Sequence, residues 1–258
     1  MKEQIIPMKK LLPFLAFLLT SFTSFAQQNQ FSSSGYEQDN NWQNEFKINL
    51  FAFAFKSISV EYERQIRPKT TFTLNFRVMP KSTLPFKNSF KNAISDTSTA
   101  NQLDNFKTGN VALMPSIRFY VGHRGAFHGF YIAPFLEYAH YTANLPYKYY
   151  DSDYKIIPLS GSMNTFTGGF MLGAQWNLSA AVNIDWWIFG PHYGISKGSI
   201  SGKKSLSSSE QDALKVELDN LDIPLTKTTN TVDANGATVD FSGPWGGIRS
   251  GLCIGIKF

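Results

Sequence analysis

Residues 57–79 read SISVEYERQIRPKTTFTLNFRVM, and this stretch decides the fold class. Apolar and polar residues alternate along it, on both sides of a turn at Arg67-Pro68-Lys69. A two-residue period bounded by turn residues is typical of β-strands that have one apolar and one polar face. The stretch therefore predicts a pair of antiparallel strands, at Ser57–Ile66 and Thr70–Met79.

The same alternation recurs along the rest of the chain. It predicts eight strands, at Phe46–Phe53, Ser57–Ile66, Thr70–Met79, Asn110–Gly122, Gly129–Tyr141, Thr165–Leu178, Val182–Tyr193 and Gly247–Phe258. The longest uncharged stretch, 156–184, is rich in Gly, Ser, Thr and Asn, which is unlike a lipid-soluble helix. We therefore predict an all-β protein. Pro115 and Pro134 fall inside two of the strands, where each removes a hydrogen-bond donor and predicts a bulge or a weakened rung.

The composition of the two strand faces indicates which surroundings each face meets. Hydrophobic residues make up 43% of the chain and charged residues 17%, and the polar strand faces consist mostly of small residues. A soluble sandwich would carry Lys and Glu on a face exposed to water. Small polar residues fit the inside of a narrow barrel, and bulky apolar residues fit lipid. The sequence thus predicts an eight-stranded antiparallel up-and-down transmembrane β-barrel.

Charged residues within the strands nearly balance and share the polar face. They are Glu61, Glu63, Arg77, Arg118, Glu137, Asp185 and Arg249, with Lys47 and Lys257 toward the strand ends. Inside a sealed barrel such charges must pair, because an unpaired buried charge costs several kcal/mol. We therefore predict a lumenal charge network. The alternative is a set of ordinary solvated strand charges.

The connections between the predicted strands alternate in length. The short ones are Arg67–Lys69, His123–His128 and Ser179–Ala181, and the long ones are Pro80–Gly109, Thr142–Asn164 and Gly194–Gly246. Outer-membrane barrels place short turns in the periplasm and long loops outside. The tight first connection, Ala54–Lys56, is an exception.

Within the last loop we expect a helix at Ser207–Leu221 and a hairpin at Thr231–Phe241 with a type I′ turn at Asn235-Gly236. These elements either cap the barrel or bind an external ligand.

The N-terminus has the pattern of an export signal. Lys9 and Lys10 precede a short apolar run, and Ser24-Phe25-Ala26 is a small-x-small cleavage site. We predict a signal peptide at 1–26, with Met1 or Met8 as the start, a flexible lead-in at 27–44 and the barrel at 45–258. These features predict the cell outer membrane as the location.

The end of the chain, LCIGIKF at 252–258, resembles the C-terminal signal of bacterial outer-membrane barrels. The resemblance implies that the barrel-assembly machinery recognises Leu252, Ile254, Ile256 and Phe258, although Ile256 replaces the usual aromatic residue. KINL at 47–50, VEYER at 60–64 and GPWGG at 243–247 look like uncharacterised outer-membrane barrel proteins of Bacteroidota, with a small OmpA/OmpX-like architecture. This group implies no activity.

The sequence contains no recognisable catalytic or cofactor motif. G-x-S-x-G, H-E-x-x-H and a glycine-rich phosphate loop are absent, and Cys253 is the single cysteine. We therefore expect no catalytic residues, no cofactor, no metal and no nucleic-acid partner, and a monomer in contact with outer-membrane lipid. His123 and His128 share a predicted turn and are read as solvated rather than as a weak metal site.

Several other functions stay open. A lipid-A-modifying or phospholipid-modifying enzyme could use His140 and His192, which we place on lipid-facing positions near the outer strand ends, with Ser160, Ser162 or Ser196 nearby. A porin is disfavoured because side chains fill an eight-stranded barrel. A lipocalin-like soluble ligand-binding barrel and a β-sandwich adhesin are disfavoured by the small, sparsely charged polar face.

Overall fold

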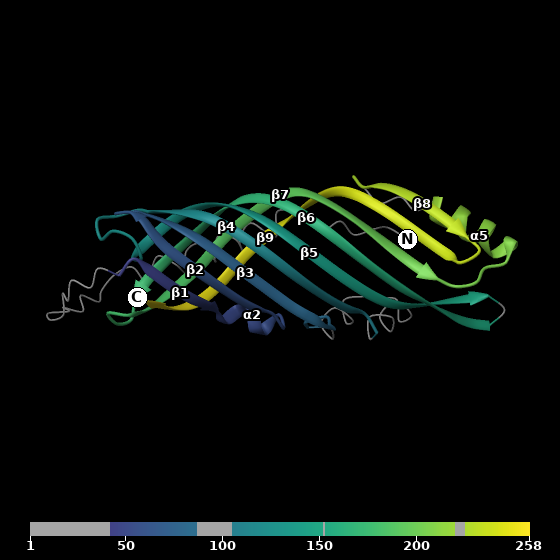
Figure 1. The fold of residues 1–258 in the computed structure, drawn as a ribbon, viewed down its shortest axis with the longest axis horizontal. Helices are drawn as coiled ribbons and strands as arrows, with labels where there is room; N and C mark the ends of the chain where they lie inside the picture. The colour runs from purple at the N-terminus through teal and green to yellow at the C-terminus, as the bar shows by residue number, and fades with distance from the viewer. Residues whose placement is uncertain (1–41, 87–104, 152, 220–224) are drawn as a thin grey trace, which may run out of the picture. The chain divides into compact units, whose positions relative to one another are not determined.

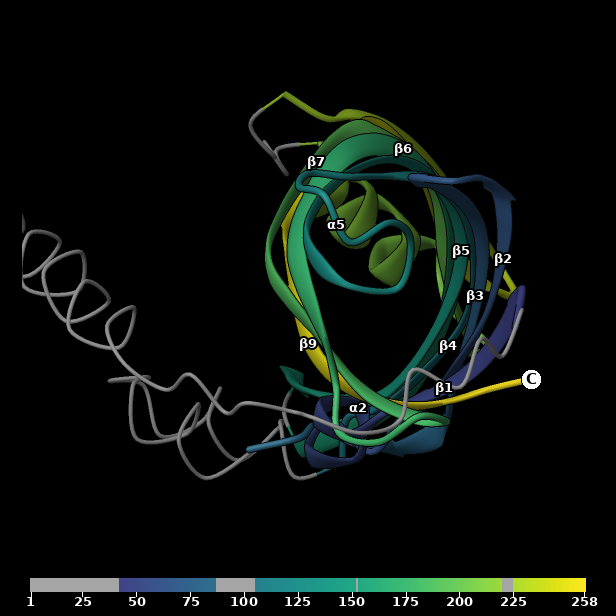
Figure 2. The ribbon, with the colours of Figure 1, turned by 90° about the vertical axis from the view of Figure 1, so that its left-hand side faces the viewer.

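A closed ring of antiparallel strands forms the body of the protein in the computed structural model, which describes residues 42–86, 105–151, 153–219 and 225–258 (Figures 1 and 2). The strands of the ring are β1 (Asn44–Asn49), β2 (Ile58–Arg67), β3 (Thr70–Thr83), β4 (Lys107–Tyr120), β5 (Gly129–Asp151), β6 (Asp153–Asn177), β7 (Val182–Lys203) and β9 (Gly236–Lys257). Neighbours in the chain pair with each other, and β1 closes the ring by pairing with β9 from Glu45↔Lys257 to Asn49↔Cys253. The predicted eight-stranded up-and-down barrel is confirmed.

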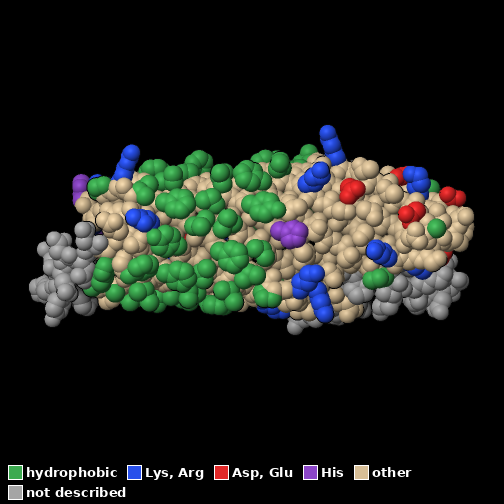
Figure 3. Space-filling view, in the orientation of Figure 1, with side chains coloured by type: hydrophobic (Ala, Val, Ile, Leu, Met, Phe, Trp, Pro, Cys, Tyr) green, Lys and Arg blue, Asp and Glu red, His purple; other side chains and the backbone are tan. Residues whose placement is uncertain are grey.

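Strand alternation sorts the side chains between the inside and the outside of the ring. Along β3, Thr71 and Thr73 are buried, whereas Phe72, Leu74 and Phe76 are exposed. The same division holds in the other strands, so that exposed apolar side chains form a belt around the end that carries the short turns (Figure 3). Beyond this apolar belt the visible surface is largely polar. The interior is therefore polar and the outside apolar, the arrangement found in membrane barrels.

The first predicted strand is only partly correct, because its second half is helical. β1 ends at Asn49, and Leu50–Ala54 forms the short helix α2. The Asn49 side chain accepts hydrogen bonds from the backbone N–H groups of Phe51 and Ala52, which caps the helix. Lys56 adopts a positive φ of 55° just after the helix, a conformation common where helices end. The run LFAFAF is apolar on every side, so it lacks the alternation that would specify a strand.

The cap of α2 can be tested by removing its acceptor. Asn49→Ala is expected to lower the free energy of unfolding by about 1 kcal/mol, because two helix N–H groups lose their partner. Asn49→Ser keeps a good capping side chain and is expected to stay closer to the wild type. Urea unfolding of both variants in detergent measures the difference, and equal stability of the Asn49→Ala variant and the wild type would contradict the assigned cap.

Four strands are longer than the alternation predicts. β5, β6, β7 and β9 have 23, 25, 22 and 22 residues, whereas a tilted strand crosses a bilayer in about 9–11. The predicted loop Thr142–Asn164 is wrong, because β5 and β6 stay paired from Gly129↔Gln175 to Asp151↔Asp153. The wall of the barrel therefore continues well past the apolar belt on the side formed by these strands (Figure 1).

The last predicted loop contains the expected helix and hairpin. Helix α5 spans Ser208–Asp219, and β8 (Lys227–Asp233) pairs with the start of β9. The turn residues are Ala234 and Asn235, neither of which has a positive φ, so the predicted type I′ turn is wrong. Viewed along the barrel, α5 lies within the outline of the ring (Figure 2).

The two prolines weaken one strand pairing without shifting it. β4 and β5 keep a single register, but Met114, Pro115, Ile117 and Arg118 have no partner in β5. A weakened rung therefore replaces the alternative bulge.

Neither α2 nor α5 is long and apolar enough to span a membrane. The predicted signal peptide and most of the lead-in, to residue 41, lie outside the described residues.

Candidate functional site

A group of charged side chains fills the lumen at the level of the apolar belt. We call it the inner charge cluster, and it consists of Glu45, Lys47, Glu61, Glu63, Arg118 and Asp185. Arg118 donates hydrogen bonds to Glu61 at 2.5 Å, to Glu63 at 3.0 Å and to Asp185 at 2.6 Å. Lys47 pairs with Glu63 and lies 2.7 Å from Asp185. These side chains are almost completely shielded from solvent.

Neutral side chains complete the hydrogen bonding of the inner charge cluster. Tyr131 donates to Asp185 at 2.7 Å, and its ring lies 4.4 Å from the Arg118 guanidinium carbon. Tyr120 donates to Glu63 at 2.6 Å, and Gln175 donates to Glu45 at 2.6 Å. A buried charge network is stable only when its remaining donors and acceptors are also paired. The tyrosine and glutamine contacts supply much of this pairing.

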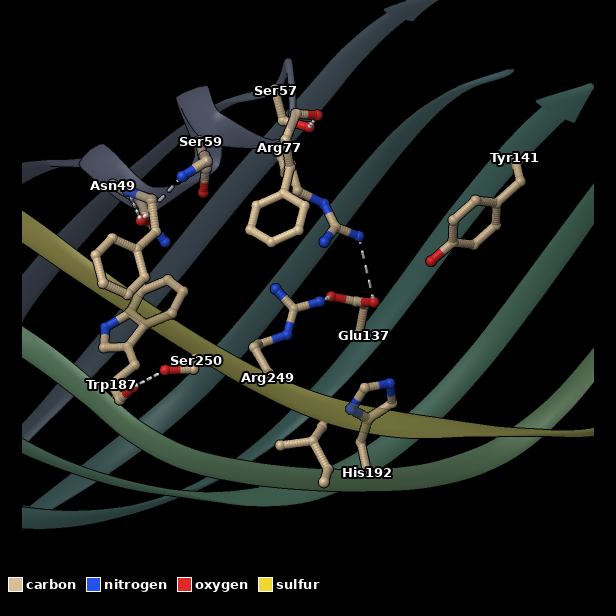
Figure 4. Close-up of a pocket in the computed structure, with 14 residues that line it drawn as sticks. Asn49, Ser57, Ser59, Arg77, Glu137, Tyr141, Trp187, His192, Arg249 and Ser250 are labelled. Atoms are coloured by element: carbon tan, nitrogen blue, oxygen red, sulfur yellow. Dashed lines mark hydrogen bonds and ion pairs between the residues drawn. The ribbon is translucent and has the colours of Figure 1, made fainter. Parts of the chain in front are cut away.

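A smaller group lies farther toward the long-strand end. We call it the outer charge cluster, and it consists of Arg77, Glu137 and Arg249. Glu137 pairs with Arg249 and lies 3.8 Å from Arg77. The two guanidinium groups flank the single carboxylate (Figure 4). The outer charge cluster therefore carries one more cation than anion.

The structure brings all seven predicted network residues into ion pairs, in two clusters. Glu61, Glu63, Arg118 and Asp185 belong to the inner charge cluster, and the other three residues form the outer one. Lys47, expected near a strand end, instead contacts four carboxylates at the centre. The sequence signal for this inward position is the alternation along β1, because Glu45, Lys47 and Asn49 share one face of the strand and that face points into the lumen.

A cavity of about 400 Å³ lies beside the outer charge cluster (Figure 4). Its inner wall includes Arg77, Glu137, Arg249, Trp187 and His192. Residues of α2 and the outward-facing Ile248 and Ser250 also line it. Because both faces of β9 contribute, the cavity passes through the barrel wall rather than ending inside the lumen.

His192 faces the lumen, so its predicted lipid-facing placement is wrong. A register irregularity lies between Trp187 and Gly190 on β7, and beyond it the inward positions change parity. The His192 ring therefore packs near buried Phe135, with ring centroids 6.2 Å apart. His140 is half-buried on the outer face, and its Nδ1 lies 2.8 Å from the side-chain oxygen of Asn164. The two histidines considered for catalysis thus lie on opposite faces of the wall.

Groups that could hold a metal are engaged by cations of the protein itself. Glu61, Glu63 and Asp185 bring their oxygens within 4.8 Å of one another, but Arg118 and Lys47 occupy the space between them. In the short turn after β4, His128 lies 2.8 Å from the Arg124 guanidinium. Burial lowers the pKa of His128, and the charge of Arg124 lowers it further.

The chain has a distant structural similarity to a known protein. No protein-family model matches the chain, and no curated protein matches it. The chain is similar to a solved structure, a major outer membrane protein from Thermus thermophilus, with a TM-score of 0.35 and 10% identity. The match covers 83% of this chain and 99% of that one.

Proposed function

We propose that this chain is a closed outer-membrane barrel that does not conduct ions and acts through its outer end. Its function in this proposal is structural or interactive at the cell surface, and it is not an enzyme. The observation that carries the proposal is the buried inner charge cluster, which fills the lumen at the level of the apolar belt. A small barrel filled by paired side chains leaves no aqueous path.

The lengths of the strands support a role for the outer end. With the short turns in the periplasm, β5, β6, β7 and β9 project beyond the bilayer, and β8 and α5 extend the same end (Figure 1). An exposed scaffold of paired strands holds its surface more rigidly than a loop does. A ligand or partner outside the cell would therefore meet an extended wall, with α5 as its cap.

Several finer expectations belong to the same proposal. The outward-facing residues Leu252, Ile254, Ile256 and Phe258 would be recognised by the barrel-assembly machinery during insertion. The chain would be a monomer of the Bacteroidota type that its sequence resembles. The lipid-modifying enzyme is the weaker alternative, since His140 and His192 do not share a face.

Ion conductance tests the closed lumen. The full-length protein, inserted into a planar bilayer, is expected to show no steady channel at neutral pH, whereas an open porin measured in parallel conducts. Because the inner charge cluster spans the lumen, the absence of current should persist at both voltage polarities. A stable, ohmic channel in the wild-type protein would contradict the proposal.

A further inference from the structure

Among the described residues, the strand pairing that forms the barrel wall is incomplete beside β9. β1 and β8 both pair with the same edge of β9. The pairing with β1 stops at Cys253, and the pairing with β8 extends from Gly236 only to Ser242. No described strand pairs with the edge between these points, from Gly243 to Leu252, although Leu225 and Thr226 lie beside Gly243. We call this gap the lateral opening. It coincides with the cavity, which Ile248 and Ser250 line from this stretch of β9.

The rim of the lateral opening is apolar. Helix α2 lies next to β9 at the point where β1 would have continued, and Phe51 and Phe55 line the cavity. Their side chains are 46% and 53% exposed, and Ile248 on the opposite rim is 70% exposed. Unpaired strand edges at membrane depth are tolerated only where protein covers them or where they line a cavity. The lateral opening therefore joins the apolar belt to the lumen.

The inner end of the cavity carries two arginines with unused hydrogen-bond donors. Arg249 is 9% exposed, and its Nε has no hydrogen-bond partner in the described structure. The Nε of Arg77 is likewise buried without a partner. Buried donors of this kind are uncommon and call for an acceptor. Glu137 is the carboxylate that faces both guanidinium groups, and the unused Nε donors offer hydrogen bonds to the oxygens of a further anion.

We propose that the lateral opening binds a single-chain anionic amphiphile from the bilayer. Its carboxylate or phosphate head accepts hydrogen bonds from Arg249 and Arg77, and its acyl chain leaves through the rim formed by Phe51, Phe55 and Ile248. A cavity of about 400 Å³ holds the head and the upper part of one chain. The rest of the chain stays in the lipid. This inference is independent of whether the barrel conducts ions.

Binding of oleate to the full-length protein in an uncharged detergent, followed by native mass spectrometry, tests the proposal. Oleate is expected to bind as a one-to-one complex, and methyl oleate, which lacks the charge, at least about tenfold more weakly, since hydrogen bonds to charged groups are the strong ones. Inorganic phosphate is the third probe. Phosphate binding that matches oleate would indicate a free-anion site and overturn the assignment to a bilayer amphiphile.

Variants separate the headgroup contacts from the fold. Arg249→Gln is expected to weaken oleate binding at least about tenfold. Glu137→Gln is expected to strengthen it severalfold, because it removes the carboxylate that competes for Arg249. Ser250→Trp fills the rim without altering charge and should also weaken binding, and Arg124→Gln, on the short turn, is the matched control. Wild-type affinity in both Arg249→Gln and Glu137→Gln, with heat-modifiable migration intact, would overturn the proposal.

Discussion

An Arg118→Leu variant is expected to lose about 3–5 kcal/mol of stability, because removing one partner of a buried ion pair leaves uncompensated charge. Arg118 contacts Glu61, Glu63 and Asp185, each within 3.0 Å. Leu cannot donate to any of them, and Lys47 alone would then face all the carboxylates of the inner charge cluster. Urea unfolding in detergent micelles, read from the fraction that migrates as the folded form without boiling, measures the change.

Two further substitutions identify the cause of the loss. Arg118→Lys keeps the charge but not the planar pair of donors, so its stability is expected to fall between those of the wild type and Arg118→Leu. Arg124→Leu removes an exposed arginine on a short turn and is expected to change stability by less than about 1 kcal/mol. Wild-type stability in Arg118→Leu would show that the inner charge cluster does not hold the barrel together.

A Lys47→Met variant is expected to lose a similar amount, about 3–5 kcal/mol, for the same reason. Lys47 is fully buried and lies within 3.6 Å of Glu45, Glu61, Glu63 and Asp185. Methionine matches the length of the lysine stem, so lost charge rather than a new cavity dominates the effect. The same urea titration provides the measurement.

Lys257→Met is the matched control for Lys47→Met. Lys257 lies near the end of β9, where its amine donates to Asn177 at 3.1 Å, and exposed polar contacts of this kind contribute at most about 1 kcal/mol. The control also compares Lys47 and Lys257, which the sequence analysis expects in similar positions toward the strand ends. Equal losses in both variants would contradict the central position of Lys47.

The sequence was sufficient to predict the barrel because the two-residue alternation indicates where the strands lie and which side chains point to each face. Thr71, Phe72 and Thr73 already show which side chains point inward, and the structure confirms this division. The same alternation allowed the charged residues within the strands to be assigned to one face, the lumenal one. Their separation into two clusters was not visible, since pairing depends on the heights that strand register sets.

The misplaced features share a physical cause: local irregularity interrupts the alternation. A capped apolar turn of helix replaces the strand after Asn49. The irregularity between Trp187 and Gly190 reverses the face of His192. The segment after Thr142 remains strand because β5 and β6 pair along their whole length, although its polar composition resembles a loop. Tertiary pairing, rather than local preference, decides such segments.

Membrane fractionation combined with gel migration tests the central claim most directly. The full-length chain, expressed with its N-terminal segment, is expected in the outer-membrane fraction, where unboiled samples resist detergent and migrate faster than boiled ones. This result would establish a closed barrel inserted in the outer membrane. A soluble periplasmic protein whose migration is the same before and after boiling would contradict the account and favour a soluble ligand-binding barrel.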